Sequence, residues 1–180
     1  MTKQRFRKTS LQTLRALSWQ KRYIADKKIN RLLYRMIQAQ KAQSVMLYIP
    51  LDLEVDVRPL IARLRREGIL VLVPFMEGES FRLVKYRLPL EIKKYGVKEP
   101  KISRQFRKKS INISIVPIVG TDISLRRIGF GKGMYDRFFM REKKWINKTV
   151  FVQRVFCFSK EIVTDDHDVG ADSVITALSS

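Results

Sequence analysis

The chain has 180 residues, of which 45% are hydrophobic, and this is enough to build one compact domain with a substantial core. No stretch approaches the roughly 20 uninterrupted apolar residues that a membrane span requires, and the N-terminus is polar rather than a signal sequence. A single cysteine excludes an internal disulfide, and a single histidine excludes a Cys/His zinc site. We therefore expect a cytoplasmic protein without membrane contact, in which any metal is held by oxygen atoms.

The strongest feature of the composition is its positive charge. The chain carries 37 Lys and Arg against 17 Asp and Glu, a formal net charge of +20. Such a field attracts anions of any kind, so nucleic acids, nucleotides and polyanionic metabolites all fit it. The basic residues are dispersed from Lys3 to Lys160, with only short clusters such as the one at 104–109. Composition alone does not choose among these partners.

The first half of the chain predicts two helices and then a strand, helix, strand unit. Residues 2–41 lack Gly and Pro and carry apolar residues at helical spacing. An apolar, β-rich run follows at 44–49, a helical pattern covers 57–67, and Gly68 lies where a C-terminal cap belongs. The next apolar run, at 69–75, completes the unit, which favours neighbouring parallel strands joined by a right-handed crossover.

The second half predicts further strands and one short helix. We expect a hairpin arm at 80–86, loops and short elements at 87–110, and a buried strand at 111–119. A loop at 121–127 leads to the sequence GFGKG, a helix at 134–143 follows, and strands are expected at 149–156 and 173–176. Alternating strands and helices predict a single α/β domain over residues 1–180 with a mostly parallel sheet.

The sequence GFGKG at 129–133 is the first candidate for chemistry. Glycines allow close backbone approach and positive φ, and the free N–H groups of the helix that follows suit a phosphate. Lys132 within the loop and Arg127 before it add positive charge. The spacing matches neither the P-loop nor the dinucleotide-binding pattern. From the glycines alone, a tight turn before a helix fits at least as well.

Asp136 lies two or three residues into that helix. A carboxylate there is favoured by the helix dipole and also has Arg137 as a neighbour. A carboxylate beside a phosphate site is equally suited to hold Mg²⁺. The residues alone leave both interpretations open.

The longer segment VPIVGTDISLRRIGFGKGMYDRFF resembles the signature of the 5-formyltetrahydrofolate cyclo-ligase family, VPxxxFDxxGxRLGxGxGYYDRxL. Four more patches resemble family motifs in the same order: KQRFR, LEVDVRPLI, YGVKEP and DDHDVGADSVIT. The chain departs from the family pattern at several positions, where it carries Val57, Thr121, Leu125, Lys132 and Met134. The resemblance spans nearly the whole chain and is dense in these patches.

The resemblance implies a three-layer α/β fold in which helices flank a mostly parallel sheet. It also implies an enzyme that converts 5-formyltetrahydrofolate to 5,10-methenyltetrahydrofolate with ATP and Mg²⁺, releasing ADP and phosphate after phosphorylation of the formyl oxygen. Phosphoryl transfer needs positioning and charge neutralisation more than a protein nucleophile. This is consistent with a sequence that offers no convincing pair of nucleophile and base.

Carried over by position, the resemblance assigns a site. The residues expected to bind ATP are Lys3, Arg7, Arg127, Gly129, Phe130, Gly131, Lys132, Gly133, Met134 and Tyr135. Those expected to contact the folate are Ile49, Glu54, Phe130, Gly131, Lys132, Gly133 and Met134. Arg127 and Lys132 are the expected catalytic residues, and Asp136 and Asp168 the expected metal ligands.

Simpler interpretations of the same residues stay open. Lys3 and Arg7 also fit a solvated basic N-terminus, and Asp168 fits a turn-forming aspartate. Glu54 also fits an exposed loop acid, and Ile49 a core strand residue. Each of these is decided by where the side chain lies in the fold.

Two other functions are weighed against the folate enzyme. The first is a basic protein that binds nucleic acid, with Trp19, Tyr23 and Tyr34 as a stacking surface. It is disfavoured because the charge is dispersed and no RNP-like strand or recognition helix is present. The second is an ATP-using relative with another substrate. For the folate enzyme, the excess positive charge suits a polyglutamate tail; we expect a monomer, although no sequence feature determines the oligomeric state.

Overall fold

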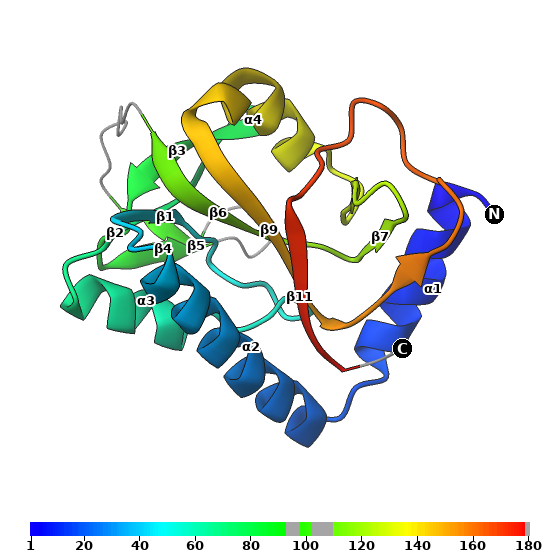
Figure 1. The fold of residues 1–180 in the computed structure, drawn as a ribbon, viewed down its shortest axis with the longest axis horizontal. Helices are drawn as coiled ribbons and strands as arrows, with labels where there is room; N and C mark the ends of the chain where they lie inside the picture. The colour runs from blue at the N-terminus through cyan, green and yellow to red at the C-terminus, as the bar shows by residue number, and fades with distance from the viewer. Residues whose placement is uncertain (93–97, 102–109, 179–180) are drawn as a thin grey trace.

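Two helices open the chain, as predicted, in a computed structural model that describes residues 1–92, 98–101 and 110–178 (Figure 1). They are α1 (Lys3–Arg15) and α2 (Trp19–Ala39). Residues 16–18 separate them, and the Ser18 side chain caps α2 by accepting a hydrogen bond from the Lys21 N–H at 3.4 Å. The buried residues of α2 are Ala25, Ile29, Leu33 and Ile37. Their four-residue spacing gives the helix one apolar face.

A six-stranded sheet forms the centre of the molecule, in the order β11–β9–β6–β1–β2–β3. Neighbouring strands are parallel except β3, which pairs antiparallel with β2. The helix α3 (Arg58–Arg66) connects β1 to β2, which confirms the predicted strand, helix, strand unit. The strands are β1 (Ser44–Met46), β2 (Leu70–Glu77), β3 (Ser80–Lys85), β6 (Ile111–Pro117), β9 (Ile146–Val155) and β11 (Ser173–Leu178).

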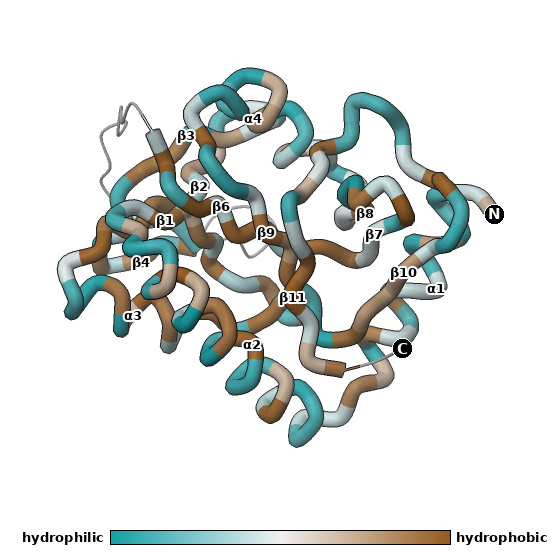
Figure 2. The backbone as a smooth tube through the Cα atoms, viewed as in Figure 1, coloured by the Kyte–Doolittle hydropathy of each residue, from teal (hydrophilic) through white to brown (hydrophobic). Residues whose placement is uncertain are grey.

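The sheet lies between two layers of helices because its side chains alternate between two apolar clusters. Val45 and Val71 face the side covered by α2 and α3, whereas Met46 and Leu72 face the side covered by α4 (Met134–Glu142). Figure 2 shows hydrophobic residues on the central strands and alternating hydrophobic and hydrophilic residues along α2. This arrangement confirms the expected fold, a single α/β domain with helices on both faces of a mostly parallel sheet.

A second, smaller sheet corrects one prediction. Its three strands, in the order β10–β7–β8, are β7 (Gly120–Asp122), β8 (Arg127–Ile128) and β10 (Phe158–Ser159). The predicted loop at 121–127 is therefore wrong at its ends, which are strands. These strands have two or three residues each and no apolar alternation, so only their pairing across the fold reveals them. The buried Phe6 and Leu14 of α1 pack in the same cluster as Ile128 of β8.

The basic span after β3 contains short elements, as expected. They are the antiparallel pair β4 (Leu90–Ile92) and β5 (Lys98–Pro100). A short 3-10 helix, η2 (Lys143–Trp145), follows α4. Gly96, within the YGVKEP patch, and the basic cluster at 104–109 lie outside the described residues. Within the described part of the chain, no helix combines the length and apolar character needed to cross a membrane.

The topology places a site at the carboxyl ends of β1 and β6. These two parallel strands are neighbours, but the chain leaves β1 toward β2 on one side and β6 toward β9 on the other. The loops that follow them therefore diverge and leave a crevice between them. Ligands of open α/β sheets bind at such a point.

Candidate functional site

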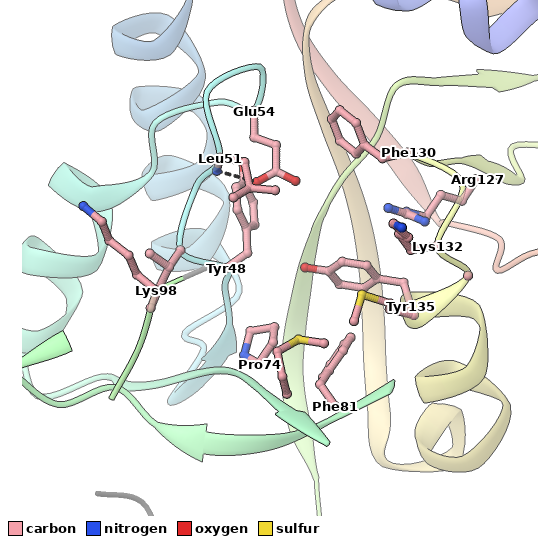
Figure 3. Close-up of a pocket in the computed structure, with 14 residues that line it drawn as sticks. Tyr48, Leu51, Glu54, Pro74, Phe81, Lys98, Arg127, Phe130, Lys132 and Tyr135 are labelled. Carbon is pink, nitrogen blue, oxygen red and sulfur yellow. Dashed lines mark hydrogen bonds between the residues drawn. The ribbon is translucent and has the colours of Figure 1, made fainter. Parts of the chain in front are cut away.

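The first part of the site is a mostly apolar pocket at this crevice (Figure 3). Tyr48 and Ile49 follow β1 into one wall, and Tyr135 of α4 extends its ring from the opposite side. The cavity has a volume of about 140 Å³, roughly ten times what one water molecule needs. The remaining lining residues are Leu51, Glu54, Pro74, Met76, Phe81, Lys98, Arg127, Phe130, Lys132, Gly133 and Met134.

Glu54 is the acidic group of this pocket. Its carboxylate faces the cavity and accepts a hydrogen bond from the Leu51 N–H at 2.8 Å (Figure 3). Burial raises the pKa of Glu54 to about 7, although the Leu51 hydrogen bond and the charges of Arg127 and Arg154 favour the ionised form. The pocket therefore presents one hydrogen-bond acceptor, poised near neutrality, among apolar walls.

The second part of the site is a polar pocket that adjoins the first. Lys3 and Arg7 of α1 form one side of it, and the glycine loop and the start of α4 form the other. Arg127 and Gly133 line both pockets. The remaining residues around the polar pocket are Gly129, Gly131, Asp136, Arg137, Met140, His167 and Asp168.

Arg127 occupies the junction between the two pockets. Its side chain is buried, its Nε donates to the Pro117 carbonyl at 3.2 Å, and its guanidinium lies 4.7 Å from the centre of the Tyr135 ring. A Cβ at Gly129 would overlap the guanidinium, so this glycine makes room for it. Burial lowers the pKa of Arg127, but an arginine stays protonated in proteins. The junction therefore carries a fixed positive charge.

The glycine loop takes the conformation that its composition allows. Gly131 and Gly133 have φ values of +96° and +62°, in the region that disfavours side chains. Gly133 is the N-terminal cap of α4, so the free N–H groups at the start of that helix follow directly. The Arg7 Nε donates to the Gly129 carbonyl at 2.8 Å, which ties α1 to the loop. Loop, helix start and basic side chains thus converge, as an anion site requires.

Carboxylates line the polar pocket opposite these cations. Asp136 accepts a hydrogen bond from the Val169 N–H at 3.2 Å, and Asp168 accepts one from the Asp165 N–H at 2.7 Å. The Lys3 ammonium donates to both Asp165 and Asp168. Lys3, expected to bind ATP, and Asp168, expected to bind the metal, thus form an ion pair with each other. The Lys3 ammonium occupies a position beside Asp168 that a metal cation could take.

The oxygen donors at this place fit a divalent cation. Ligand atoms of Asp165, His167 and Asp168 lie within 4.8 Å of one another, and Asp136 lines the same pocket as His167 and Asp168. Mg²⁺ prefers oxygen ligands, and one or two carboxylates usually hold it in proteins, so the aspartates rather than His167 suit it. The residues present are therefore compatible with magnesium.

Every residue expected in the site lies in one of the two pockets. The apolar pocket holds Ile49, Glu54, Phe130, Lys132, Met134 and Tyr135, and the polar pocket holds Lys3, Arg7, Gly129, Gly131, Asp136 and Asp168; Arg127 and Gly133 belong to both. The structure thus brings together segments that are more than 100 residues apart in the chain.

Sequence reasoning missed about half of the apolar pocket. The residues not anticipated there are Tyr48, Leu51, Pro74, Met76, Phe81 and Lys98. Tyr48 is signalled by its position beside Ile49 at a strand end. The others come from β2, β3, β5 and the loop after β1. Lys98 lies within the YGVKEP patch, but nothing in that patch marked it as a site residue. The rest belong to no motif, because their role arises from how the strands are arranged. His167, which sequence reasoning left unassigned, borders the polar pocket.

The solved structures most useful for comparison are two methenyltetrahydrofolate synthetases. The chain is similar to 5,10-methenyltetrahydrofolate synthetase from Aquifex aeolicus, with 29% identity and a TM-score of 0.83 over 98% of this chain and 90% of that one. It is also similar to the enzyme from Mycoplasma pneumoniae, with 25% identity and a TM-score of 0.76 over 97% of this chain and 98% of that one.

Curated sequences and a family model agree with the structures. The chain is 24% identical over 150 residues to 5-formyltetrahydrofolate cyclo-ligase of Haemophilus influenzae, covering 79% of each protein. It is 28% identical over 155 residues to the probable 5-formyltetrahydrofolate cyclo-ligase of Schizosaccharomyces pombe, covering 76% of each. A model of the 5-formyltetrahydrofolate cyclo-ligase family matches residues 1–177. On these matches, and on the fold that it shares with the solved structures, the chain belongs to the 5-formyltetrahydrofolate cyclo-ligase family.

Proposed function

We propose that the protein converts 5-formyltetrahydrofolate to 5,10-methenyltetrahydrofolate, using ATP and Mg²⁺ and releasing ADP and phosphate. One observation carries the proposal: an apolar pocket with one acid adjoins a polar pocket of cations and carboxylates, and Arg127 lines both. A reaction between an aromatic heterocycle and a nucleoside triphosphate needs such a pair of pockets. Membership of the family supports 5-formyltetrahydrofolate as the first ligand and is consistent with ATP as the second.

The proposed reaction has two steps whose atoms balance. The formyl oxygen attacks the γ-phosphorus of ATP, and ADP leaves. The side-chain nitrogen of the folate then attacks the formyl carbon, loses its proton, and the oxygen departs as part of inorganic phosphate. Neither step needs a covalent bond to the protein, so the chain contributes positioning and charge.

On the folate side, Glu54 and the apolar walls hold the ring system. A carboxylate accepts two hydrogen bonds at once from the amino and ring N–H groups of a pterin. The raised pKa of Glu54 places its ionisation near neutral pH, so folate binding should depend on pH in that range. Ile49, Phe130 and Met134 flank the ring, and Tyr135 closes the pocket toward Arg127.

On the phosphate side, basic side chains and the two aspartates have different roles. Arg127 is buried at the junction, where it can stabilise charge on the transferring phosphoryl group. Lys132 lines the folate pocket from the glycine loop, and Lys3 and Arg7 approach the polar pocket from α1. Asp136 and Asp168 would hold Mg²⁺, which neutralises phosphate charge when bound.

The remaining expectations concern the setting of the reaction. The net charge of +20 suits a folate with a polyglutamate tail, because each added glutamate brings another carboxylate. We place the enzyme in the cytoplasm and expect it to act as a monomer. Gel filtration of the purified protein with and without ligands tests the oligomeric state.

The reaction is tested by incubating purified protein with 5-formyltetrahydrofolate, Mg²⁺ and ATP and following the near-ultraviolet absorbance of the methenyl product. We expect a signal that requires ATP. Asp136→Asn and Arg127→Lys should each reduce turnover at least about 100-fold, because a point charge does not replace a planar guanidinium and an amide does not replace a metal ligand. Arg63→Gln, in an exposed ion pair on α3, is the matched control and should keep wild-type turnover.

A preparation that is folded but gives no ATP-dependent product contradicts the proposal. Near-normal turnover in either site variant contradicts the role given to that residue. Tight binding of RNA or DNA that persists at high salt, together with no turnover, would favour the nucleic-acid protein instead.

A further inference from the structure

Arg154 is a buried cation that the proposed reaction does not use. It lies near the carboxyl end of β9 and lines a groove on the outer side of Glu54. This groove shares Leu51 and Glu54 with the apolar pocket, so Glu54 stands between the two spaces. An arginine that is only 6% exposed needs a structural reason, because burial of a charge is costly unless it is fully paired.

The guanidinium of Arg154 is held in one geometry by three hydrogen bonds. Its Nε and one terminal nitrogen donate to the two carboxylate oxygens of Asp26 on α2, at 2.8 and 2.9 Å. The other terminal nitrogen donates to the Asp52 carbonyl at 3.2 Å. A bidentate pair of this kind fixes the plane of the guanidinium. The third bond thereby fixes the backbone two residues before Glu54.

Other side chains hold the backbone on the far side of Glu54. The buried Tyr48 hydroxyl donates to the Val55 carbonyl at 2.9 Å, and the Asn30 amide donates to the Asp56 carbonyl at 2.7 Å. Glu54 thus lies in a segment whose carbonyls accept hydrogen bonds from β9, from Tyr48 after β1 and from α2. On the N-terminal side of Glu54, the hydrogen bond comes from Arg154 to the Asp52 carbonyl.

We propose that Arg154, locked by Asp26, is a positioning residue that holds the Glu54 carboxylate in the direction of the folate pocket. The proposal rests on the proposed function for its ligand. Its physical basis is preorganisation: a loop carboxylate that is already fixed loses less freedom when a ligand binds, so the affinity is higher.

Several charged or titratable groups line the two spaces on either side of Glu54. From other elements they are Asp26 and Arg22 of α2, Tyr48 after β1, Lys98 of β5, Arg127 of β8, and Lys132 and Tyr135 at the glycine loop and α4. Asp52, Asp56 and Arg58 belong to its own segment. Removing Arg154 alone would change this charge balance and leave Asp26 unpaired, so the test replaces both partners.

The first test measures binding of 5-formyltetrahydrofolate to Arg154→Met/Asp26→Leu. Replacing a buried ion pair by apolar residues of similar size generally preserves folding, so we expect a melting temperature near that of the wild type. The dissociation constant should rise about tenfold, the equivalent of one lost charge-assisted hydrogen bond. Arg63→Met, which breaks an exposed pair on α3, is the matched control and should bind as the wild type does.

A double-mutant cycle separates positioning from a general structural effect. If Arg154 acts through Glu54, the Arg154→Met/Asp26→Leu replacement should weaken binding no further in a Glu54→Ala background. Equal losses in both backgrounds, or no loss in the wild-type background, would overturn the proposal.

A third measurement needs no ligand and so stays informative if the folate reaction is wrong. Carbon-13 NMR of protein labelled at the glutamate carboxyl carbons follows the titration of Glu54, identified by its absence in Glu54→Gln. In Arg154→Met/Asp26→Leu the lost charge of Arg154 by itself raises the titration midpoint of Glu54. The freer loop exposes Glu54, and this lowers the midpoint by more, because burial is the largest cause of the raised pKa. The titration midpoint should then fall by about one pH unit or more toward that of an ordinary glutamate. An unchanged midpoint overturns positioning, whereas failure of the wild type to bind 5-formyltetrahydrofolate overturns the proposed function.

Discussion

Asp122 is a buried carboxylate whose replacement should destabilise the segment that leads to Asp168. It lies on β7, its side chain is fully buried, and its two oxygens accept five hydrogen bonds. Two come from Ser124, and three come from the Val163 N–H and from the N–H and hydroxyl of Thr164, at 2.6 to 2.9 Å. These bonds tie the segment that leads to Asp168 onto the small sheet. Burial raises the pKa of Asp122, but the hydrogen bonds together lower it to about 2.

The expected cost of Asp122→Asn follows from that arrangement. An asparagine offers one oxygen, so it can keep the Val163 and Thr164 donors only by turning its amide toward Ser124. The lost charge and the unpaired Ser124 N–H together cost about 2–4 kcal/mol. For a chain of this size the melting temperature should fall by about 5–15 °C. Asp166→Asn, in an exposed ion pair of the same segment, should change stability by less than about 0.5 kcal/mol.

The contribution of Asp122 to the free energy of unfolding should depend on pH in a known direction. The folded-state pKa of about 2 lies below that of an unfolded aspartate, so the carboxylate stabilises the fold at pH values above about 4 and this contribution is lost as the pH falls toward 2. Urea unfolding at a series of pH values should show a constant difference between wild type and Asp122→Asn from pH 7 to 5, and a shrinking one below pH 4. A difference under about 0.5 kcal/mol at pH 7, or one that does not change with pH, would refute the reasoning.

Three further predictions concern residues of the site and its supports. The pKa of Glu54 is raised to about 7, so the folded protein keeps a proton that the unfolded chain loses between about pH 4.3 and 7. Glu54→Gln should therefore be as stable as wild type near pH 4 and about 3 to 4 kcal/mol more stable at pH 8. A gain in stability that is the same at both pH values in urea titrations would contradict this. Leu125 has a φ of +54° where the family pattern has glycine, so Leu125→Gly should unfold at a higher temperature than Leu125→Ala, by the equivalent of about 1 kcal/mol; equal melting temperatures would show that the backbone is not strained. Lys3→Met should lower the free energy of unfolding by about 1–3 kcal/mol because it leaves the buried Asp168 without its cation. Adding Asp168→Asn should recover part of that loss in urea unfolding. No recovery would show that Lys3 stabilises the protein in another way.

The glycine loop shows how far local sequence leads. Positive φ at Gly131 and Gly133 and a helix start at Met134 follow from composition, and the structure has all three. Whether the loop is a turn or a ligand site did not follow from its glycines. That distinction depends on Arg7 and Arg127, which approach the loop from α1 and β8.

Helices and strands were predicted correctly where their buried residues recur at a regular spacing in the sequence. They were missed where the element is too short to show such a spacing. The spacing of Ile29, Leu33 and Ile37 defines a helix because one face of α2 covers the sheet. The strands β7 and β8 have no such pattern, because two or three residues cannot show an alternation. They exist because Gly120 and Thr121 find partners across the small sheet.

The sequence by itself determined the α/β class, the positions of the long helices and central strands, and, through the extended motif from Val116 to Phe139, the family. The tertiary structure alone decided that Glu54 faces a cavity, that Lys3 pairs with Asp168, and that Phe81 and Met76 complete the wall of the apolar pocket. The physical reason is range: helices and strands reflect neighbours within a few residues, whereas the pockets depend on contacts between segments far apart in the chain, which strand order and crossover connections bring together.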